Sequence, residues 1–373
     1  MKPKLAYIGE KYFPSRGGTS RVIENLTRKM KDDFDITVYC HRHQKAKGYM
    51  PGVHVVQFPS LPFGSFGVFV YYFLCALHAL LYGKFNLVHV HKIDAAFVIP
   101  ILSKKYRVVA TSHESPYLRD KWNWLGKKYF LLCERIFIHS SAALTSISRP
   151  LADYYLSKYQ KEVQFIPNGI EITEKIDMKG ASEILQRYAI HEGYIMFAAR
   201  RIMATKGIHT FLEALDYIQY KGDVVIAGDT SHAPQLIKKL IQKHTALNLK
   251  FIGYVDQLGV LLALVKEAKL FIFPSETEGM SIMLLEVASM GTPLVCSDIP
   301  ENTQVFTGNE VTYFRNKDAV DLGNKITEAL HDMKVSVEKA ENAVRKIKEV
   351  YLWDKIVTEY HALYSSILEK NSF

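Results

Sequence analysis

Short, mostly apolar runs alternate with longer stretches of helical periodicity along nearly all of the 373 residues. Such runs are typical of strands buried on both faces of a parallel sheet. Their alternation with helices predicts an α/β protein built on parallel sheets with helices on both faces. We expect strands near residues 5–10, 36–41, 53–58, 87–91, 107–112, 143–147, 163–166, 194–199, 223–228, 249–253, 270–273, 293–296 and 311–314.

A chain of this length exceeds the usual size of one hydrophobic core, so the sequence predicts two domains. The turn residues Pro167, Asn168 and Gly169 end a predicted strand and mark the boundary. We expect domains over residues 1–168 and 169–351, with the polar stretch 171–193 as connector and entry helix. A final helix is expected from residue 352 onward. Further helices are expected near residues 18–31, 66–83, 94–104, 124–138, 150–158, 207–220, 233–245, 256–267, 281–290, 301–306 and 318–332.

The net charge of +9 is unevenly distributed. Residues 1–168 hold 24 Lys and Arg against 11 Asp and Glu, whereas residues 169–373 hold 23 against 27. This asymmetry indicates that the first domain faces an anionic partner. Because no zinc-finger, RNP or basic-zipper pattern is present, an anionic membrane or lipid acceptor is favoured over nucleic acid. A merely basic surface is the alternative.

Two segments of the first domain carry residues suited to a membrane surface. The stretch 61–82 approaches the roughly 20 residues of a membrane span, but it contains Gly64, Gly67 and His78 and lies between two predicted strands. We interpret it as a domain-one helix with an unusually apolar surface, either a core helix or a partly membrane-facing one. The second segment is a basic and aromatic patch that suits a bilayer interface. The alternative is an amphipathic core helix with lysines that reach to solvent. The patch consists of Arg119, Lys121, Trp122, Trp124, Lys127, Lys128 and Tyr129.

The cysteines and the start of the chain bear on its compartment. Cys40, Cys75, Cys133 and Cys296 are scattered without metal-binding spacing, which suits reduced thiols in a cytosolic protein. A predicted strand begins at Leu5, and no signal peptide is visible before it.

The segment 274–287 holds two carboxylates, Glu278 and Glu286, with seven residues between them. Glu278 and Gly279 lie in the loop between an apolar strand and a helix. The helix N-terminus offers free N–H groups and a positive dipole end to an anion, and the glycine lets backbone approach a ligand. The loop can therefore hold a phosphate while the two carboxylates accept hydrogen bonds from hydroxyls. A diphosphate flanked by hydroxyls is the chemistry of a nucleotide sugar.

Glu278 and Glu286, followed by Gly-Thr-Pro at 291–293, resemble the signature of the retaining GT-B glycosyltransferases of family GT4. The resemblance covers nearly the whole chain. It implies two Rossmann-like domains facing a cleft, with the C-terminal helix 352–373 crossing back to the first domain. The second domain would bind the nucleotide sugar and the first the acceptor. Glu286 would hold the ribose and Glu278 would touch the sugar, beside the donor-binding positions Gly279, Met280, Ser281 and Leu285.

A second element resembles the family's phosphate-binding loop. Within residues 197–207 a predicted strand ends, Arg201 and Lys206 follow across a short loop, and Gly207 opens a helix. The resemblance implies that these two cations bind the donor pyrophosphate and stabilise charge on the leaving group. Ala199 and Arg200 depart from the family pattern, and Arg200 is the substitute if the loop is shifted by one residue.

The first domain carries further elements of the resemblance. Gly17 and Gly18 join the first strand to a helix and are similar to the family's glycine-rich loop, which contacts a phosphate or sugar. His113 follows another strand end and resembles the histidine that approaches the donor sugar near its reacting carbon. His89 and His91 alternate on a strand and are interpreted as structural or acceptor-side residues. Dinucleotide-binding and Walker patterns are absent, which weakens NAD, FAD and ATP as ligands.

Asp33 and Asp35 form a D-x-D, with which metal-dependent GT-A enzymes hold a divalent ion. Here the motif lies in a charged turn before an early strand, and we interpret its two aspartates as solvated turn residues. The GT-B resemblance implies no cofactor and no essential metal.

The resemblance implies a retaining, metal-independent hexosyltransferase with Arg201, Lys206, Glu278 and His113 as catalytic residues. Attack would occur on the front face, with the leaving phosphate taking the acceptor proton. A UDP-sugar is the expected donor and a GDP-sugar the second choice. The acceptor would be a glycan or lipid-linked saccharide in bacterial cell-surface polysaccharide or glycolipid synthesis. We expect a cytoplasmic protein, peripheral on the inner face of the cell membrane. The alternatives are a GT-B-fold sugar-nucleotide epimerase and a non-catalytic membrane-binding module.

Overall fold

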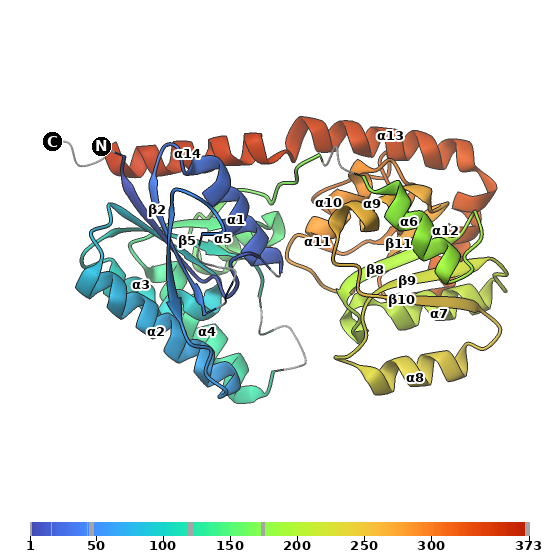
Figure 1. Cartoon of the computed structure of the whole chain (residues 1–373), viewed down its shortest axis with the longest axis horizontal. Helices are drawn as coiled ribbons and strands as arrows, with labels where there is room; N and C mark the ends of the chain where they lie inside the picture. The colour runs from blue at the N-terminus through green and yellow to red at the C-terminus, as the bar shows by residue number, and fades with distance from the viewer. Residues whose placement is uncertain are drawn as a thin grey trace. The chain divides into compact units, whose positions relative to one another are not determined.

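The computed structural model describes residues 2–15, 17–42, 44, 48–115, 117, 122–172 and 176–369. The chain divides into two compact units (Figure 1). Unit 1 consists of Met1–Gly169 with Trp353–Phe373, and unit 2 of Ile170–Leu352. Both divisions fall one residue after the domain limits expected from the sequence.

The sheet of unit 1 has strands β1 (Lys4–Ile8), β2 (Asp35–His41), β3 (Val53–Phe58), β4 (Leu87–His91), β5 (Arg107–Ser112), β6 (Ala143–Ser146) and β7 (Gln164–Phe165). They are ordered β3-β2-β1-β4-β5-β6-β7, and neighbouring strands pair in parallel. The order reverses between β1 and β4. In open parallel sheets, ligands bind beyond the carboxyl ends of the strands at such a switch point.

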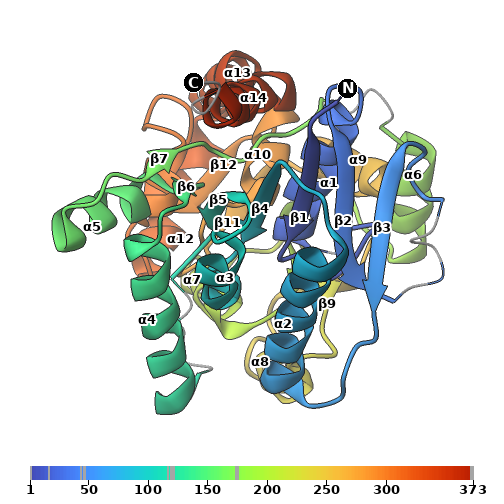
Figure 2. The same ribbon diagram turned by 90° about the vertical axis from the view of Figure 1, so that its left-hand side faces the viewer.

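Helices cover both faces of this sheet (Figure 2). They are α1 (Gly18–Met30), α2 (Gly64–Tyr82), α3 (Ile99–Leu102), α4 (Trp124–His139), α5 (Arg149–Tyr159) and α14 (Trp353–Glu369), with a 3₁₀ helix at Ile93–Val98. Because side chains alternate along a strand, Ala6 and Ile8 of β1 point to one face and Tyr7 points to the other. Residues of α2, α3 and α4 pack on the Ile8 side, whereas α14 contacts Tyr7 on the opposite side.

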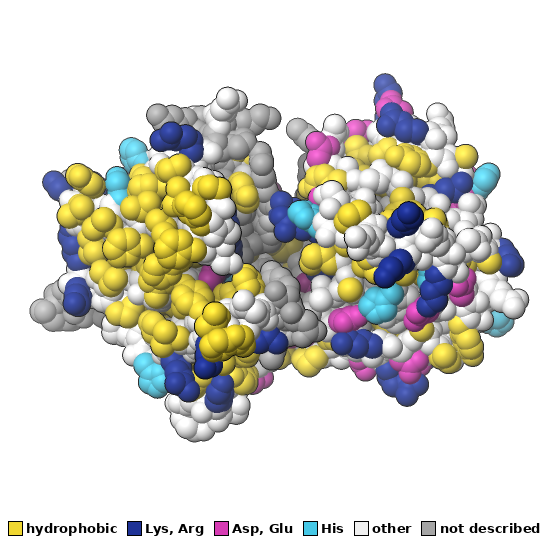
Figure 3. All heavy atoms as spheres, turned by 90° about the horizontal axis from the view of Figure 1, so that it is seen from below, with side chains coloured by type: hydrophobic (Ala, Val, Ile, Leu, Met, Phe, Trp, Pro, Cys, Tyr) yellow, Lys and Arg dark blue, Asp and Glu magenta, His cyan; other side chains and the backbone are white. Residues whose placement is uncertain are grey.

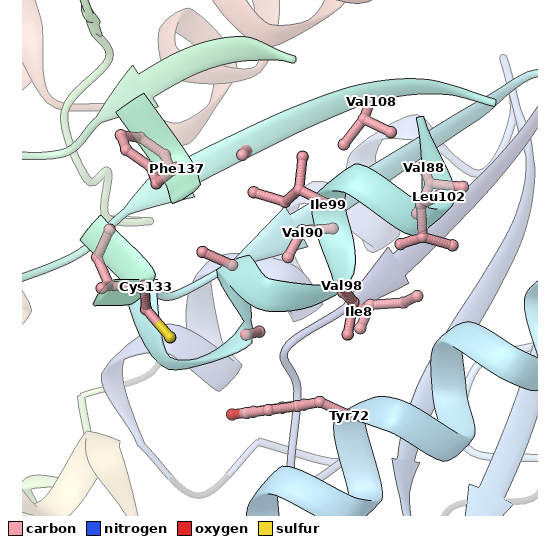
Figure 4. Packing of buried hydrophobic residues seen from close by; sticks show 14 of the residues in the cluster. Ile8, Tyr72, Val88, Val90, Val98, Ile99, Leu102, Val108, Cys133 and Phe137 are labelled. Atoms are coloured by element: carbon pink, nitrogen blue, oxygen red, sulfur yellow. The ribbon is translucent and has the colours of Figure 1, made fainter. Parts of the chain in front are cut away.

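The main core of unit 1 lies between the sheet and helices α2 to α4. Figure 4 shows aliphatic side chains of the strands interleaved with residues of these helices and of the 3₁₀ helix. The labelled core residues are Ile8, Tyr72, Val88, Val90, Val98, Ile99, Leu102, Cys133, Phe137 and Val108.

All four cysteines are buried free thiols, and burial raises the pKa values of Cys40, Cys75, Cys133 and Cys296.

The C-terminal helix α14 completes the other face of unit 1. Its Tyr364 is fully buried, with the hydroxyl 2.6 Å from Nδ1 of His89 and 3.4 Å from the hydroxyl of Tyr7. The prediction that the final helix returns to the first domain is therefore confirmed.

Unit 2 repeats the architecture with strands β8 (Ile195–Arg201), β9 (Asp223–Asp229), β10 (Asn248–Gly253), β11 (Leu270–Phe273), β12 (Leu294–Ser297) and β13 (Thr312–Phe314). Their order is β10-β9-β8-β11-β12-β13, all parallel, with the switch point between β8 and β11. The helices are α6 (Met178–Arg187), α7 (Ile208–Tyr217), α8 (Pro234–Lys243), α9 (Leu258–Glu267), α10 (Ile282–Ser289), α11 (Pro300–Thr303), α12 (Ala319–His331) and α13 (Met333–Val350).

Helix α13 was not among the helices that we expected from the sequence. Its buried positions recur at helical spacing, but three of the four are small: Ser336, Ala340, Ala343 and Ile347. A stripe of small residues gives only a weak hydrophobic period. A capping signal was available, because the side chain of Asp332 accepts a hydrogen bond from the N–H of Val335.

Helix α2 is, among the described residues, the one helix long and apolar enough to cross a membrane, and a third of its apolar window is buried. Its Tyr71, Tyr72 and Cys75 belong to the core of unit 1. The segment is therefore a helix of the α/β unit with an apolar surface, as we expected.

Candidate functional site

The loops after β8 and β11 carry most of the predicted donor-binding residues, and they are joined to each other. The two strands are paired neighbours in the sheet. Beyond them, the N–H of Glu276 donates a hydrogen bond to the carbonyl of Thr205, with 3.0 Å between nitrogen and oxygen. The segments 201–207 and 274–281 therefore meet at the switch point of unit 2.

At Gly207 the backbones of the two loops lie close together. Gly207 has a φ of +71°, and a Cβ built on it would lie 1.8 Å from the carbonyl oxygen of Pro274. Only glycine satisfies both the left-handed backbone and this backbone contact. Gly207 thus sets the distance between the cation of the first loop and the carboxylate of the second.

That cation and carboxylate form an ion pair. Nζ of Lys206 lies 2.5 Å from Oε1 of Glu278, with side-chain exposures of 27% and 10%. The pair holds Lys206 at the edge of the site, with its side chain partly exposed to solvent. An incoming phosphate can therefore gain a charge-assisted hydrogen bond from an ammonium that is already positioned.

A second carboxylate, Glu276, links the same loop to two other segments of unit 2. Its Oε1 lies 3.2 Å from Nε2 of His209 in α7, and its Oε2 lies 3.2 Å from Nζ of Lys317 before α12. The sequence analysis did not identify this residue. Its partners come from positions 67 and 41 residues distant in sequence, so no local pattern reveals the arrangement.

Glu301 of α11 is another residue that the sequence analysis did not assign to the site. Burial raises the pKa of its carboxyl, and the negative charge of Glu278 adds to the rise. The carboxylate of Glu278 is thus near enough to Glu301 to interact electrostatically. The proline-glutamate pair that opens a helix after β12 was the available signal.

The start of α10 presents the backbone of the predicted phosphate loop. Ser281 is the N-cap, its hydroxyl accepts a hydrogen bond from the N–H of Leu284, and the first turn has no acidic residue. The side chains of Met280 and Leu285 are buried. Gly279, Met280 and Ser281 can therefore contact an anion mainly through backbone N–H groups.

Glu286 lies inside α10 with a relative exposure of 3%. A carboxylate buried to this degree is stable only with hydrogen-bond donors around it, so its position is fixed. It lies on the helix that Ser281 begins, whereas Glu278 lies in the loop before it. The two predicted glutamates are thus presented by adjoining elements.

Arg201 ends β8 and is exposed, as is its neighbour Arg200. Arg201 is opposite Asp229 in the strand register. The pKa of the Asp229 carboxyl is lowered by hydrogen bonds from Ser231, and the charges of His232 and Arg201 contribute further. Both arginines lie at the end of β8, a few residues before Lys206.

In unit 1, Gly9 shows that backbone segments pack closely at the β1–β4 switch point. It has a φ of +115°, and a Cβ there would lie 2.2 Å from the carbonyl oxygen of His91. Gly17 is the N-cap of α1 and Gly18 its first residue. A Cβ at Gly18 would meet no heavy atom of the described chain within 4 Å. The glycine-rich segment therefore offers an open helix N-terminus beside the sheet.

His113 follows β5 and is hydrogen-bonded to a second buried histidine. Its Nε2 lies 3.0 Å from Nδ1 of His91, whose ring is 3.9 Å, centroid to centroid, from that of His89. Burial, with a contribution from the charge of Lys92, lowers the pKa of His113 from 6.5 to about 3. His113 is therefore a neutral imidazole at physiological pH, suited to hydrogen-bonding a hydroxyl.

Within the described ranges, no group of three or more His, Cys, Asp or Glu residues is arranged to hold a metal ion. The two acids of the D-x-D each lie near a histidine. Asp33 is 3.8 Å from Nε2 of His361, and Asp35 is 3.3 Å from Nε2 of His54.

Two protein families match the chain. The model described as "Glycosyl transferases group 1" matches residues 182–350, and the model described as "Glycosyltransferase Family 4" matches residues 16–174. The matched segments correspond closely to unit 2 and unit 1.

Similar proteins match most of the chain. An uncharacterized 41.2 kDa protein in the cps region of Klebsiella pneumoniae is 24% identical, over 94% of this chain and 97% of its own. The putative glycosyltransferase EpsF of Bacillus subtilis is 23% identical, over 76% and 77%. A crystal structure of Anabaena HepE in complex with UDP and glucose has a TM-score of 0.81 and 17% identity, and the match covers 98% of this chain and all of that one.

Proposed function

We propose that this chain, which has the GT-B fold and matches the group 1 glycosyltransferase model over residues 182–350, transfers a hexosyl group from a nucleotide sugar with retention at the anomeric carbon. The observation that carries this proposal is the Lys206–Glu278 ion pair, which lies where the loops after β8 and β11 meet. It combines a phosphate-binding cation with an acceptor of sugar hydroxyl hydrogen bonds in one place.

The proposed donor site lies in unit 2. Arg201, Lys206 and the N–H groups of 279–281 bind the diphosphate, Glu278 binds the sugar and Glu286 the ribose. As the bond between C1 and the phosphate breaks, negative charge builds on the leaving phosphate. A fixed ammonium and fixed N–H dipoles stabilise that charge without having to reorganise.

The proposed role of His113 is that of a neutral group that hydrogen-bonds a sugar hydroxyl. Its lowered pKa argues against a cation that would repel the positive charge developing on the ring. The acceptor approaches the front face, and the departing phosphate takes the acceptor's proton. The proposed enzyme needs no cofactor and no essential metal.

We propose a UDP-sugar as donor, with a GDP-sugar as second choice. The HepE crystal structure contains UDP and glucose and shares this fold. The proposed acceptor is a glycan or lipid-linked saccharide of bacterial cell-surface polysaccharide or glycolipid synthesis. The cps region that encodes the Klebsiella relative supports that setting. The proposed location is the cytoplasmic face of the cell membrane.

A thermal-shift screen tests the donor proposal. UDP, GDP, ADP and their common sugar conjugates are compared with and without EDTA, because a ligand that binds only the folded state raises the melting temperature. We expect a shift with one UDP-sugar, unchanged by EDTA and lost in Lys206→Ala. The matched control is Lys243→Ala, which removes an exposed ion pair of the same unit with Glu213.

Product analysis then separates the transferase from its alternatives. A transferase joins the sugar to an added acceptor, whereas an epimerase releases free sugar or an epimer. If no nucleotide or nucleotide sugar shifts the melting temperature, with or without acceptor, the transferase proposal is wrong and a non-catalytic binding module is favoured.

A further inference from the structure

The outer face of α2 is apolar, although it is exposed to solvent. Residues 64–82 contain no charged side chain. The inner face is buried in the core of unit 1, and an ordinary surface helix would carry polar residues on the opposite side. Here the outward positions are instead large and apolar, with exposures between 40% and 73%: Phe63, Phe66, Phe73, Leu77, Leu81 and Tyr82.

The apolar surface continues from α2 onto α3 and α4. Phe69 of α2 stacks on Phe97 at a centroid distance of 4.3 Å and meets Tyr129 of α4 at 6.3 Å. Figure 3 shows hydrophobic side chains gathered across this face of unit 1. The exposed members on α3 and α4 are Ile101, Trp124, Leu125, Leu131 and Leu132. We call the exposed apolar residues on these three helices, together with Phe63, the α2–α4 face.

Unit 2 offers a comparison. Its exposed large aromatic residues, Tyr217 and Tyr254, come from α7 and the loop after β10, and the exposed hydrophobic residues that share a helix are the three small valines of α13. Single exposed apolar residues of this kind are ordinary, whereas a continuous apolar surface marks an interaction site.

Exposed cations lie around the α2–α4 face, whereas none of the acids that the structure describes between residues 59 and 139 is exposed. Residues 59–139 contain 10 Lys and Arg against 4 Asp and Glu. The acids that the structure describes there, Asp94, Glu114 and Glu134, are buried or half-buried. Lys84, Lys104 and Lys128 are exposed, and Nζ of Lys128 lies 4.7 Å from the ring centroid of Trp124. Two members of the basic and aromatic patch that we expected, Arg119 and Lys121, lie outside the described residues.

We propose that the α2–α4 face docks on a bilayer containing anionic lipid, with α2 lying in the interface rather than crossing it. Spanning would require Tyr71, Tyr72 and Cys75 to leave the core, whereas docking buries only side chains that are already exposed. The inference deepens the proposed membrane location and names the surface responsible. It does not depend on the identity of the donor.

The charge pattern favours a bilayer over a second copy of this chain. In a two-fold dimer the lysines around one face would meet the lysines around the other, and the described acids of residues 59–139 are not exposed to neutralise them. Lipid headgroups supply phosphates at that rim, while the acyl region accepts the aromatic and aliphatic side chains.

Vesicle sedimentation of the full chain tests the proposal. We expect binding to vesicles of phosphatidylcholine mixed with phosphatidylglycerol, weaker binding to phosphatidylcholine alone, and a partial loss of binding at about 0.5 M salt. The double variant Phe66→Ser/Leu81→Ser should lower partitioning by at least roughly tenfold. The triple variant Lys84→Gln/Lys104→Gln/Lys128→Gln should remove the preference for anionic vesicles.

The matched control is Tyr217→Ser/Tyr254→Ser, which changes exposed aromatic residues of unit 2 and should leave partitioning unchanged. Melting temperatures confirm that each variant is folded. An equal loss of vesicle binding in the control and the test variants would overturn the proposal. Vesicle binding that is unchanged in both the apolar and the lysine variants would also overturn it. Concentration-dependent dimers that vanish in Phe66→Ser/Leu81→Ser, without vesicle binding by the parent chain, would assign the face to self-association instead. Nucleotide-sugar binding, measured separately by thermal shift, shows whether the donor proposal stands or fails on its own.

Discussion

Nδ1 of His91 lies 3.0 Å from Nε2 of His113, and both rings are buried. A hydrogen bond between neutral imidazoles needs one nitrogen to carry the proton and the other to accept it. The tautomer of His113 is therefore coupled to that of His91. The orientation of the His113 ring also depends on the ring of His91.

His91→Phe tests this coupling. We expect kcat to fall by roughly tenfold, because His113 loses the partner that fixes its orientation, while KM for the nucleotide sugar changes little. His54→Phe, at an exposed histidine of the same unit, is the control. Equal kcat values in His91→Phe and the parent enzyme would show that His91 has no positioning role.

The stability of unit 1 should depend on the protonation of His113. Its pKa is about 3 in the folded protein against 6.5 ordinarily, so the unfolded chain binds the extra proton between these pH values. This contribution to the free energy of unfolding is fully present above pH 6.5 and is lost as the pH falls towards 3. His113→Gln cannot take up that proton. Denaturant titrations should therefore show its stability improving relative to the parent as the pH is lowered from about 7 to 5. A constant difference would contradict the prediction.

Glu10 should have the opposite dependence. It is fully buried, and burial raises its pKa from 4.5 to about 7. Its stabilising contribution is therefore present below 4.5 and is lost as the pH rises through about 7. Glu10→Gln resembles the protonated acid and keeps an Oε1 that can accept from the N–H groups of Lys11 and Tyr12. We expect Glu10→Gln to raise the melting temperature at about pH 8 and to change it little at about pH 5. Equal melting temperatures at pH 8 would show that Glu10 ionises without cost.

A charge swap can separate the two roles of the Lys206–Glu278 pair. Lys206→Glu should abolish the donor-induced shift in melting temperature, because a carboxylate repels the diphosphate. Adding Glu278→Lys restores an ion pair, which is worth about 1 kcal/mol or less at this exposure. We expect the double variant to recover the ligand-free melting temperature of the parent without recovering transfer. Recovered transfer would mean that the pair acts only as a structural link.

Gly207→Ala should destabilise unit 2 by at least ~2 kcal/mol, because it combines a left-handed backbone with a clash against the carbonyl of Pro274. Gly253 has a similar φ of +76° but open space around its Cβ position, so Gly253→Ala isolates the backbone cost. Denaturant unfolding should give a clearly larger loss for Gly207→Ala. Similar losses would mean that the loops can separate without penalty.

The sequence predicted the elements that have a strong period and the residues that lie in local motifs. Strands such as β4 and β11 are short apolar runs, and Lys206 and Glu278 each lie in a recognisable loop. The ion pairs of Glu276 with His209 and Lys317 were not predictable, because the three residues lie in segments that are distant in sequence. Neither was the contact between His89 and Tyr364, which lie 275 residues apart. Local periodicity identifies elements, but only the assembled sheets decide which side chains meet.

The return of α14 to unit 1 has a consequence for the order of events during translation. Unit 2 is one continuous segment, Ile170–Leu352, and all of it is synthesised before α14. Unit 1 lacks Tyr364, and with it the hydroxyl beside His89, until α14 has left the ribosome. Nascent chains commonly fold from the N-terminus onward. Here the second unit can finish first, while the part of the unit 1 sheet that α14 covers stays exposed and available to a chaperone.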